Sequence, residues 1–138
     1  MNRFHLLEHT ADIGIEATAD SREGLVEQIS LGLKLLLFGA VEAKPLFTEI
    51  ITAEGNTLEE TLVNWLNELL FLMADKLFIP AEISINHYSF NNISAEISGE
   101  HFDPSRHQIL RDIKAVTHHQ TYVGHDDSSW QSTVYLDL

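Results

Sequence analysis

The sequence predicts an α+β protein in which two main helices pack on one face of a mixed or antiparallel β-sheet. Two long stretches carry apolar residues at helical spacing, and most of the remaining chain alternates polar and apolar residues with the period of a strand. The order of these segments, β–β–α–β–α–β–β–β–β, lacks the regular strand–helix alternation of a doubly wound sheet. With 138 residues, the chain is expected to form a single domain over residues 1–138.

The N-terminal part is expected to form a strand pair followed by a helix. Residues 4–8 and 13–19 alternate in hydrophobicity, and Asp12 lies in the turn between them. The helix starts near Ser21, whose hydroxyl suits an N-cap, and it stops at Gly39. Its expected buried face is formed by Leu25, Ile29, Leu33 and Leu36.

A third strand and a second helix follow. Residues 47–53 alternate, and residues 57–60 form a capping box ahead of a run of leucines at helical spacing. Pro80 marks the expected stop of this helical region. The apolar stripe of the helix comprises Leu58, Leu62, Trp65, Leu66, Leu69, Leu72 and Met73.

The last third of the chain alternates again. Residues 83–85 and 93–97 flank a turn near Asn91–Asn92, which predicts a hairpin. Residues 113–117 and 130–136 supply the final strands, and the polar segment 126–129 is the expected loop between them.

The charge of the chain limits its function. Twenty-one Asp and Glu residues against eight Lys and Arg give a net charge of −13. Such a surface repels phosphate backbones, so direct nucleic-acid binding is not expected, whereas divalent cations or a basic protein surface would be attracted. The chain lacks cysteine, a signal-peptide pattern and a membrane-spanning apolar run. We therefore expect a cytoplasmic protein without disulfides or membrane contact.

Asp12 and Asp137 are candidate metal ligands. Asp12 lies in a short acid–glycine turn that can offer carboxylate oxygens to Ca²⁺, Mg²⁺ or Mn²⁺, although the same pattern suits an Asx turn. Alternation persists to the end of the chain, so Asp137 and the Leu138 carboxylate are expected to be held in the sheet. An exposed acid at a sheet edge is the alternative for Asp137. A close pair of these carboxylates would also suit a metal-dependent hydrolase.

Lys114 and the histidines complete the candidate residues. Lys114 lies between apolar neighbours, where a lysine extends to solvent, pairs with an acid or contacts a partner. The eight histidines lack compact zinc-ligand spacing. His101 and His107 flank the Asp103–Pro104 turn and are expected to make local hydrogen bonds.

Taken together, short motifs spread over nearly the whole chain resemble the archease family. In chain order they are His9-Thr10-Ala11-Asp12-Ile13-Gly14, residues 65–72 (WLNELLFL), Gly99-Glu100, Asp103-Pro104-x-Arg106-His107, residues 113–119 (IKAVTHH) and Leu136-Asp137-Leu138. The chain departs from the family at His118, where Tyr is typical, and at Gln120–Thr121, where a more apolar pair is typical.

The resemblance implies an accessory protein rather than an enzyme. Archeases assist the GTP-dependent tRNA-splicing RNA ligase, which joins 3′-phosphate and 5′-hydroxyl RNA ends, by promoting ligase guanylylation and multiple turnover. The resemblance also implies a divalent-cation site (Ca²⁺, Mg²⁺ or Mn²⁺) at Asp12, Asp137 and the main-chain oxygen of Leu138, and a functional role for Lys114. The alternative is a general chaperone or modulator of protein–nucleic-acid interactions.

Overall fold

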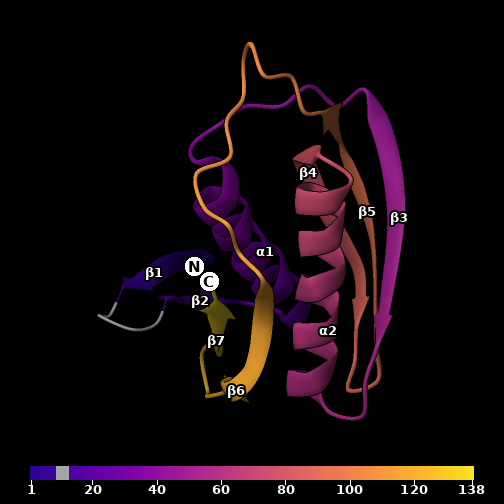
Figure 1. Cartoon of the computed structure of the whole chain (residues 1–138). Helices are drawn as coiled ribbons and strands as arrows, with labels where there is room; N and C mark the ends of the chain where they lie inside the picture. Colours follow the sequence, from indigo (N-terminus) through magenta and orange to yellow (C-terminus); the bar gives the residue numbers. More distant parts are fainter. Residues whose placement is uncertain (9–12) are drawn as a thin grey trace.

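The structure is a computed structural model that describes residues 1–8 and 13–138. In it, two helices lie between two antiparallel sheets (Figure 1). The expected order of strands and helices is confirmed. The elements are β1 (Arg3–Glu8), β2 (Ile13–Ala19), α1 (Arg22–Phe38), β3 (Phe47–Glu54), α2 (Leu58–Leu70), the π-helical turn η1 (Phe71–Asp75), β4 (Phe78–Tyr88), β5 (Asn92–His101), β6 (Ala115–His125) and β7 (Trp130–Asp137).

The strands divide into two sheets. One sheet has four strands in the order β1-β2-β7-β6, and the other has three in the order β3-β5-β4. The α+β class, the antiparallel pairing and the two main helices agree with expectation. The helices, however, cover the inner faces of two sheets instead of one face of a single sheet. The difference arises because alternation shows which face of a strand is buried but not which strand is its neighbour.

Both helices contribute to a core shared by the two sheets. α1 packs on β2 of the four-stranded sheet and on β4 of the three-stranded sheet, while α2 packs on β6 and β3. The indole Nε1 of Trp65 donates to the Ser30 hydroxyl over 3.0 Å and so joins the two helices. Both side chains are fully buried, and the Ser30 hydroxyl in turn donates to the Val26 carbonyl. These two linked hydrogen bonds satisfy buried polar groups that would otherwise destabilise the core.

Local capping sets the helix limits. Ser21 Oγ accepts from Gly24 N over 3.0 Å, and Thr57 Oγ1 accepts from Glu60 N over 3.0 Å. Gly39, with φ of 76°, ends α1 in a conformation that side chains disfavour. The second helical region ends with η1, before the expected stop at Pro80, which lies in β4 instead. Because β4 is an edge strand, a proline there removes no hydrogen bond that the sheet requires.

None of the helices among the described residues is long and apolar enough to cross a membrane.

Candidate functional site

One end of the four-stranded sheet brings together segments that are far apart in the sequence. Ile13, at the start of β2, pairs with Glu8 of β1 and with Leu136 of β7. Ala115, at the start of β6, pairs with Asp137. At this end of the sheet, strands β1 and β7 finish and strands β2 and β6 begin. We call it the β7 end.

Lys114 and Asp137 are neighbours at the β7 end. The main-chain N–H of Lys114 donates to the Asp137 carbonyl oxygen over 2.8 Å, beside the Ala115–Asp137 pair at which the β6–β7 ladder begins. Both side chains are exposed. Within the described residues, neither side chain makes a hydrogen bond or an ion pair. Two residues that are joined through the main chain therefore expose a cationic and an anionic side chain at the β7 end.

Asp12 lies outside the described residues, as does the rest of the segment 9–12. The described part of the β2–β7 ladder ends with the pair Ile13–Leu136. In the sequence, Asp12 precedes Ile13 and Asp137 follows Leu136. Residues 1–8 and 13–138 hold no group of three or more His, Asp or Glu side chains arranged for a metal ion. The expected ligand set of Asp12, Asp137 and Leu138 thus stays a prediction.

Gly14 allows close packing beside this site. A Cβ atom at Gly14 would lie 3.0 Å from the ring of Tyr135 and 3.1 Å from the carbonyl oxygen of Val134. Gly14 and Tyr135 are paired residues on β2 and β7. The glycine of the acid–x–glycine pattern therefore serves strand packing, a role that the sequence pattern alone did not distinguish from that of a ligand turn.

Asn67 anchors the start of β6, and sequence reasoning did not identify this role. Its Oδ1 accepts from Val116 N over 2.9 Å, and its Nδ2 donates to Val116 O over 2.9 Å. The amide thereby takes the place of a neighbouring strand at the free edge of β6, two residues from Lys114. The available signal was a lone amide next to the apolar stripe of α2, and its partner is distant in the sequence.

Arg111 joins three elements close to the β7 end. Its guanidinium donates to the Leu36 carbonyl over 3.0 Å and to the Glu8 carboxylate over 3.3 Å. Leu36 lies in the last turn of α1, where the helix dipole favours a positive charge. Glu8 is the last residue of β1. These two hydrogen bonds hold the segment that leads to Lys114 against α1 and β1.

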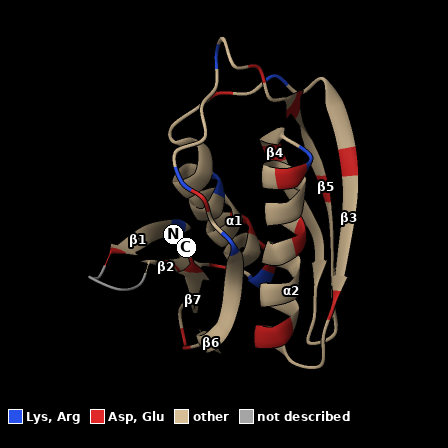
Figure 2. Ribbon diagram, in the orientation of Figure 1, with Lys and Arg blue, Asp and Glu red and all other residues tan. Residues whose placement is uncertain are grey.

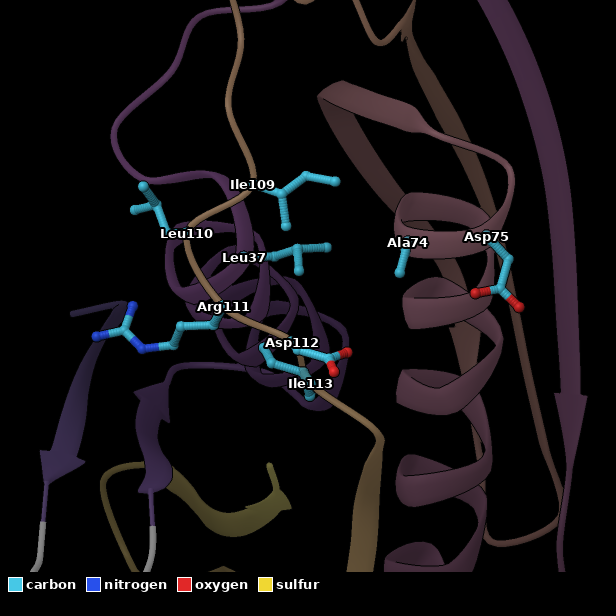
Figure 3. A pocket seen from close by; sticks show the side chains of 8 residues that line it. All are labelled: Leu37, Ala74, Asp75, Ile109, Leu110, Arg111, Asp112 and Ile113. Carbon is cyan, nitrogen blue, oxygen red and sulfur yellow. The ribbon is translucent and has the colours of Figure 1, made fainter.

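Two adjoining cavities lie between residues 109–114 and the C-terminal end of the α2 region. The larger, of about 410 Å³, is lined by Leu37 of α1, by η1 and by residues 109–113 (Figure 3). Ile109 and Leu37 point into it, whereas Arg111 extends toward β1. The smaller, of about 190 Å³, is lined in part by Asn67, Phe71 and Lys114. Lys114 therefore lies at the rim of a partly apolar groove.

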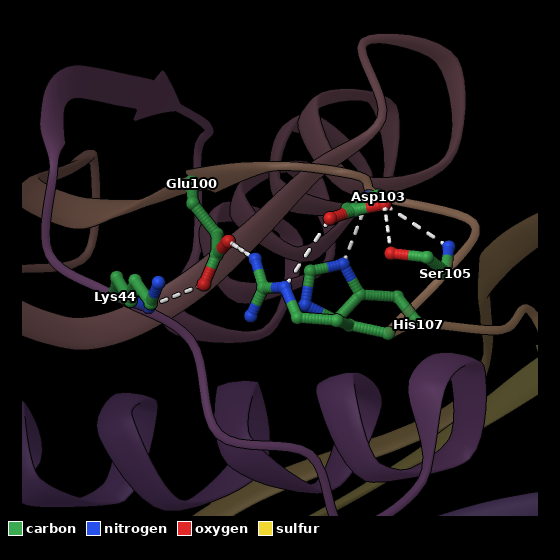
Figure 4. A network of polar contacts seen from close by, with 6 residues as sticks. Lys44, Glu100, Asp103, Ser105 and His107 are labelled. Atoms are coloured by element: carbon green, nitrogen blue, oxygen red, sulfur yellow. Dashed lines mark hydrogen bonds and ion pairs between the residues drawn. The ribbon is translucent and has the colours of Figure 1, made fainter.

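The buried carboxylate of Glu100 holds together the loop from residue 100 to residue 107 (Figure 4). The Glu100 carboxylate accepts from the Arg106 guanidinium and, over 2.5 Å, from the main-chain N–H of Lys44. The hydrogen bond from Arg106 holds the pKa of Glu100 below its ordinary value, and the bond from Lys44 acts in the same direction. Asp103 accepts from Ser105 and Arg106, and the Ser105 hydroxyl lowers the pKa of Asp103.

The histidines of this loop differ. His107 Nδ1 accepts from the main-chain N–H of Asp103 over 2.9 Å, so the expected local hydrogen bond is confirmed. His101 makes none within the described residues and packs instead against the rings of Phe47 and Phe78. The motif of residues 99–107 therefore stabilises the conformation of its own loop.

The comparisons with known proteins agree with this architecture. The sequence model of the Archease protein family (MTH1598/TM1083) matches residues 4–138. The chain belongs to the archease family. An archease from Methanopyrus kandleri is 31% identical over 135 residues, covering 96% of each chain. The resemblance inferred from the short motifs is thus confirmed.

Solved structures support the archease fold. The solution structure of Methanobacterium thermoautotrophicum protein 1598 superposes with a TM-score of 0.72, at 26% identity and 98% coverage of both chains. The crystal structure of a Thermotoga maritima archease, described as a possible chaperone, gives a TM-score of 0.61 at 22% identity, covering 96% of this chain and 94% of that one. The second likeness shows the fold alone.

Proposed function

We propose that this archease is an accessory protein that activates a GTP-dependent tRNA-splicing RNA ligase by promoting ligase guanylylation and multiple turnover. One observation supports the proposal most directly. The Lys114–Asp137 main-chain bond holds these two residues next to each other at the β7 end, and both side chains are exposed. These are the positions to which the family resemblance assigns function, and neither side chain is used by the described part of the fold.

The residues at the β7 end fit a divalent cation. Asp137 supplies an exposed carboxylate without a partner among the described residues, and Leu138 supplies main-chain oxygen. Asp12, which precedes Ile13, would supply a second carboxylate. Such an oxygen-only set suits Ca²⁺, Mg²⁺ or Mn²⁺. Two carboxylates that share one site would repel each other, and a bound cation would offset that repulsion.

The surface charge supports a protein partner over RNA itself. The net charge is −13, and acidic side chains are spread over α2 and β3 (Figure 2). An RNA-handling ligase presents basic surface, so the acidic archease would be steered toward the enzyme and repelled by its substrate. The groove beside Lys114 offers apolar surface for the same contact.

A multiple-turnover RNA ligation assay tests the role of the β7 end. We expect Asp137→Asn and Lys114→Ala each to reduce stimulation of the ligase at least about tenfold, because each removes an exposed group that the fold does not need. Asp127→Asn and Lys44→Ala are matched controls, since both side chains are exposed and lie away from the β7 end. Full stimulation by folded Asp137→Asn protein would refute the proposed role of this site.

Calorimetric titration with Ca²⁺ and Mn²⁺ tests the metal site separately. Asp137→Asn is expected to weaken binding at least about tenfold, whereas Asp127→Asn leaves it unchanged. Binding that is equal in both variants, or absent from the unmodified protein, would remove the metal from the proposal and leave the ligation result to be judged alone.

A general chaperone is the second candidate function. Phe71, Ile109 and Leu110 are exposed large apolar residues beside the two cavities, and such a surface can hold unfolded segments. The description of the Thermotoga relative as a possible chaperone points the same way. Suppression of client aggregation that is lost with Ile109→Ser but retained with Asp137→Asn would favour this function over ligase activation.

A further inference from the structure

The two sheets have four edge strands, and three of them carry features that oppose pairing with another strand. β1 spans only six residues and carries Arg3 and Glu8 at its ends. β4 contains Pro80 and two register irregularities. β6 has a register irregularity between Thr117 and Tyr122 and is bonded to Asn67 at Val116. Short length, charge, proline and bulges are the common means by which sheet edges avoid association.

β3 has fewer of these protections, namely the acids Glu49 and Glu54 and the Asn64 hydrogen bond at Glu54. Its eight residues, Phe47–Glu54, pair with β5 in continuous register, and the strand contains neither proline nor lysine. Figure 1 shows β3 at the outer margin of the molecule, and none of the described helices or strands lies along its free edge. Three large apolar residues on or next to it are exposed: Leu46 (63%), Phe47 (51%) and Ile50 (73%). An edge of this kind is a template for pairing.

The free part of β3 is self-complementary. The Glu54 carbonyl accepts from Asn64 Nδ2 over 2.7 Å, which leaves residues 47–53 as the open stretch with Ile50 at its centre. Antiparallel pairing of this stretch with itself about Ile50 sets Phe47 opposite Ala53, Thr48 opposite Thr52 and Glu49 opposite Ile51. No acid then faces an acid. A register centred one residue earlier would instead oppose the two Glu49 side chains, which is unfavourable.

We propose that β3 is a self-association surface, and that two copies of the chain pair their β3 strands antiparallel about Ile50. The two three-stranded sheets then join into one sheet, and the same residues are used by both copies, as a two-fold interface requires. The pairing covers the unbonded main-chain groups of the edge and buries Ile50 against its counterpart. It is independent of the β7 end, which belongs to the other sheet.

Net charge sets the conditions of the association. Each copy carries −13, so long-range repulsion opposes the dimer at low ionic strength. Added salt screens this repulsion but leaves main-chain pairing and apolar contact in place. The dimer is therefore expected to tighten as salt concentration rises.

Sedimentation velocity over a dilution series tests the interface. The unmodified protein is expected to dimerise, and Ile50→Lys to raise the dimer dissociation constant at least about tenfold, because two Ile side chains lose their burial. Tyr122→Lys is the control: Tyr122 is another exposed large apolar residue on an edge strand (51%, against 73% for Ile50), but lies on β6. A chain that is monomeric at every concentration and salt, or a dimer unaffected by Ile50→Lys, would overturn the proposal.

The absence of cysteine allows a direct test of the register. Ile50→Cys introduces a single thiol whose counterpart would lie directly opposite, at a Cα separation of about 5.5 Å that a disulfide can span. Oxidation is expected to link this variant into covalent dimers. Thr52→Cys is expected to cross-link only when mixed with Thr48→Cys. Cross-linking of Ile50→Cys no faster than that of Tyr122→Cys would overturn the register.

Discussion

Glu100 is a buried carboxylate whose charge is balanced locally by Arg106 and by the main-chain N–H of Lys44. The loop from residue 100 to residue 107 folds around it, and His107 closes the turn through Asp103 N. Because these hydrogen bonds stabilise the ionised form, the pKa of Glu100 lies below its ordinary value. Folding is therefore linked to the ionisation of this residue.

Acidification should weaken this contribution. A carboxyl group whose pKa is lowered in the folded state adds stability above its unfolded pKa, about 4.3 for Glu, and loses it as the pH falls through the folded value. Glu100→Gln is thus expected to lower the free energy of unfolding at pH 7, with the gap to the unmodified protein narrowing below about pH 4.3. Denaturant unfolding of both proteins at a series of pH values measures this difference in the free energy of unfolding. Glu96→Gln, exposed on the same strand, is the control. A gap independent of pH would contradict the linkage.

Sequence reasoning succeeded at single residues where the partner is close in the chain. The His107 bond to Asp103 spans one turn, and the caps at Ser21 and Thr57 act over three residues. The role of Asn67 was not foreseen, because Val116 is its partner across 49 residues. Local patterns carry no information on such contacts until the fold is known.

At the level of elements, the helices and the order of strands could be predicted, but the division into two sheets could not. Hydrophobic period identifies a strand and its buried face, and those signals lie within a few residues. The choice of β7 as the neighbour of β2 depends on helix packing over the whole chain. The candidate site inherits the same limit: Asp137 and Lys114 were named from sequence, while their contact depends on the β6–β7 ladder.

Asn67 is expected to control the order of β6 near Lys114. Asn67→Ala leaves the main-chain N–H and C=O of Val116 without their partner, at a cost of about 1–3 kcal/mol in the free energy of unfolding. Hydrogen exchange at the Val116 amide should become faster, and stimulation of the ligase should fall with it. Asn64→Ala, which removes an α2 amide bonded to β3, is the control. Unchanged exchange at Val116 would show that the edge does not depend on Asn67.

At the level of the whole molecule, net charge distinguishes the two proposed associations. Binding to a basic ligase gains from attraction, and self-association works against repulsion, so salt should affect them in opposite directions.

The rate of association with the ligase is expected to fall as ionic strength rises, because screening shortens the range of electrostatic steering. Stopped-flow or surface-based kinetics over a salt series would measure it. The dissociation rate should change less, since it depends on short-range contacts. An association rate that does not respond to salt would show that the acidic surface plays no part in partner capture.

The pairing of Ile13 with Leu136 has a consequence for how the protein is made. The three-stranded sheet and α2 lie within residues 47–101, so this part can assemble while translation continues. The four-stranded sheet cannot, since β2 pairs with β7, which is synthesised only after the whole of this part. Until β7 is in place, the apolar faces of both helices lack the complete four-stranded sheet that covers them, and Lys114 lacks its main-chain hydrogen bond to Asp137. A nascent chain would therefore acquire its ability to engage a partner only after β7 has emerged from the ribosome.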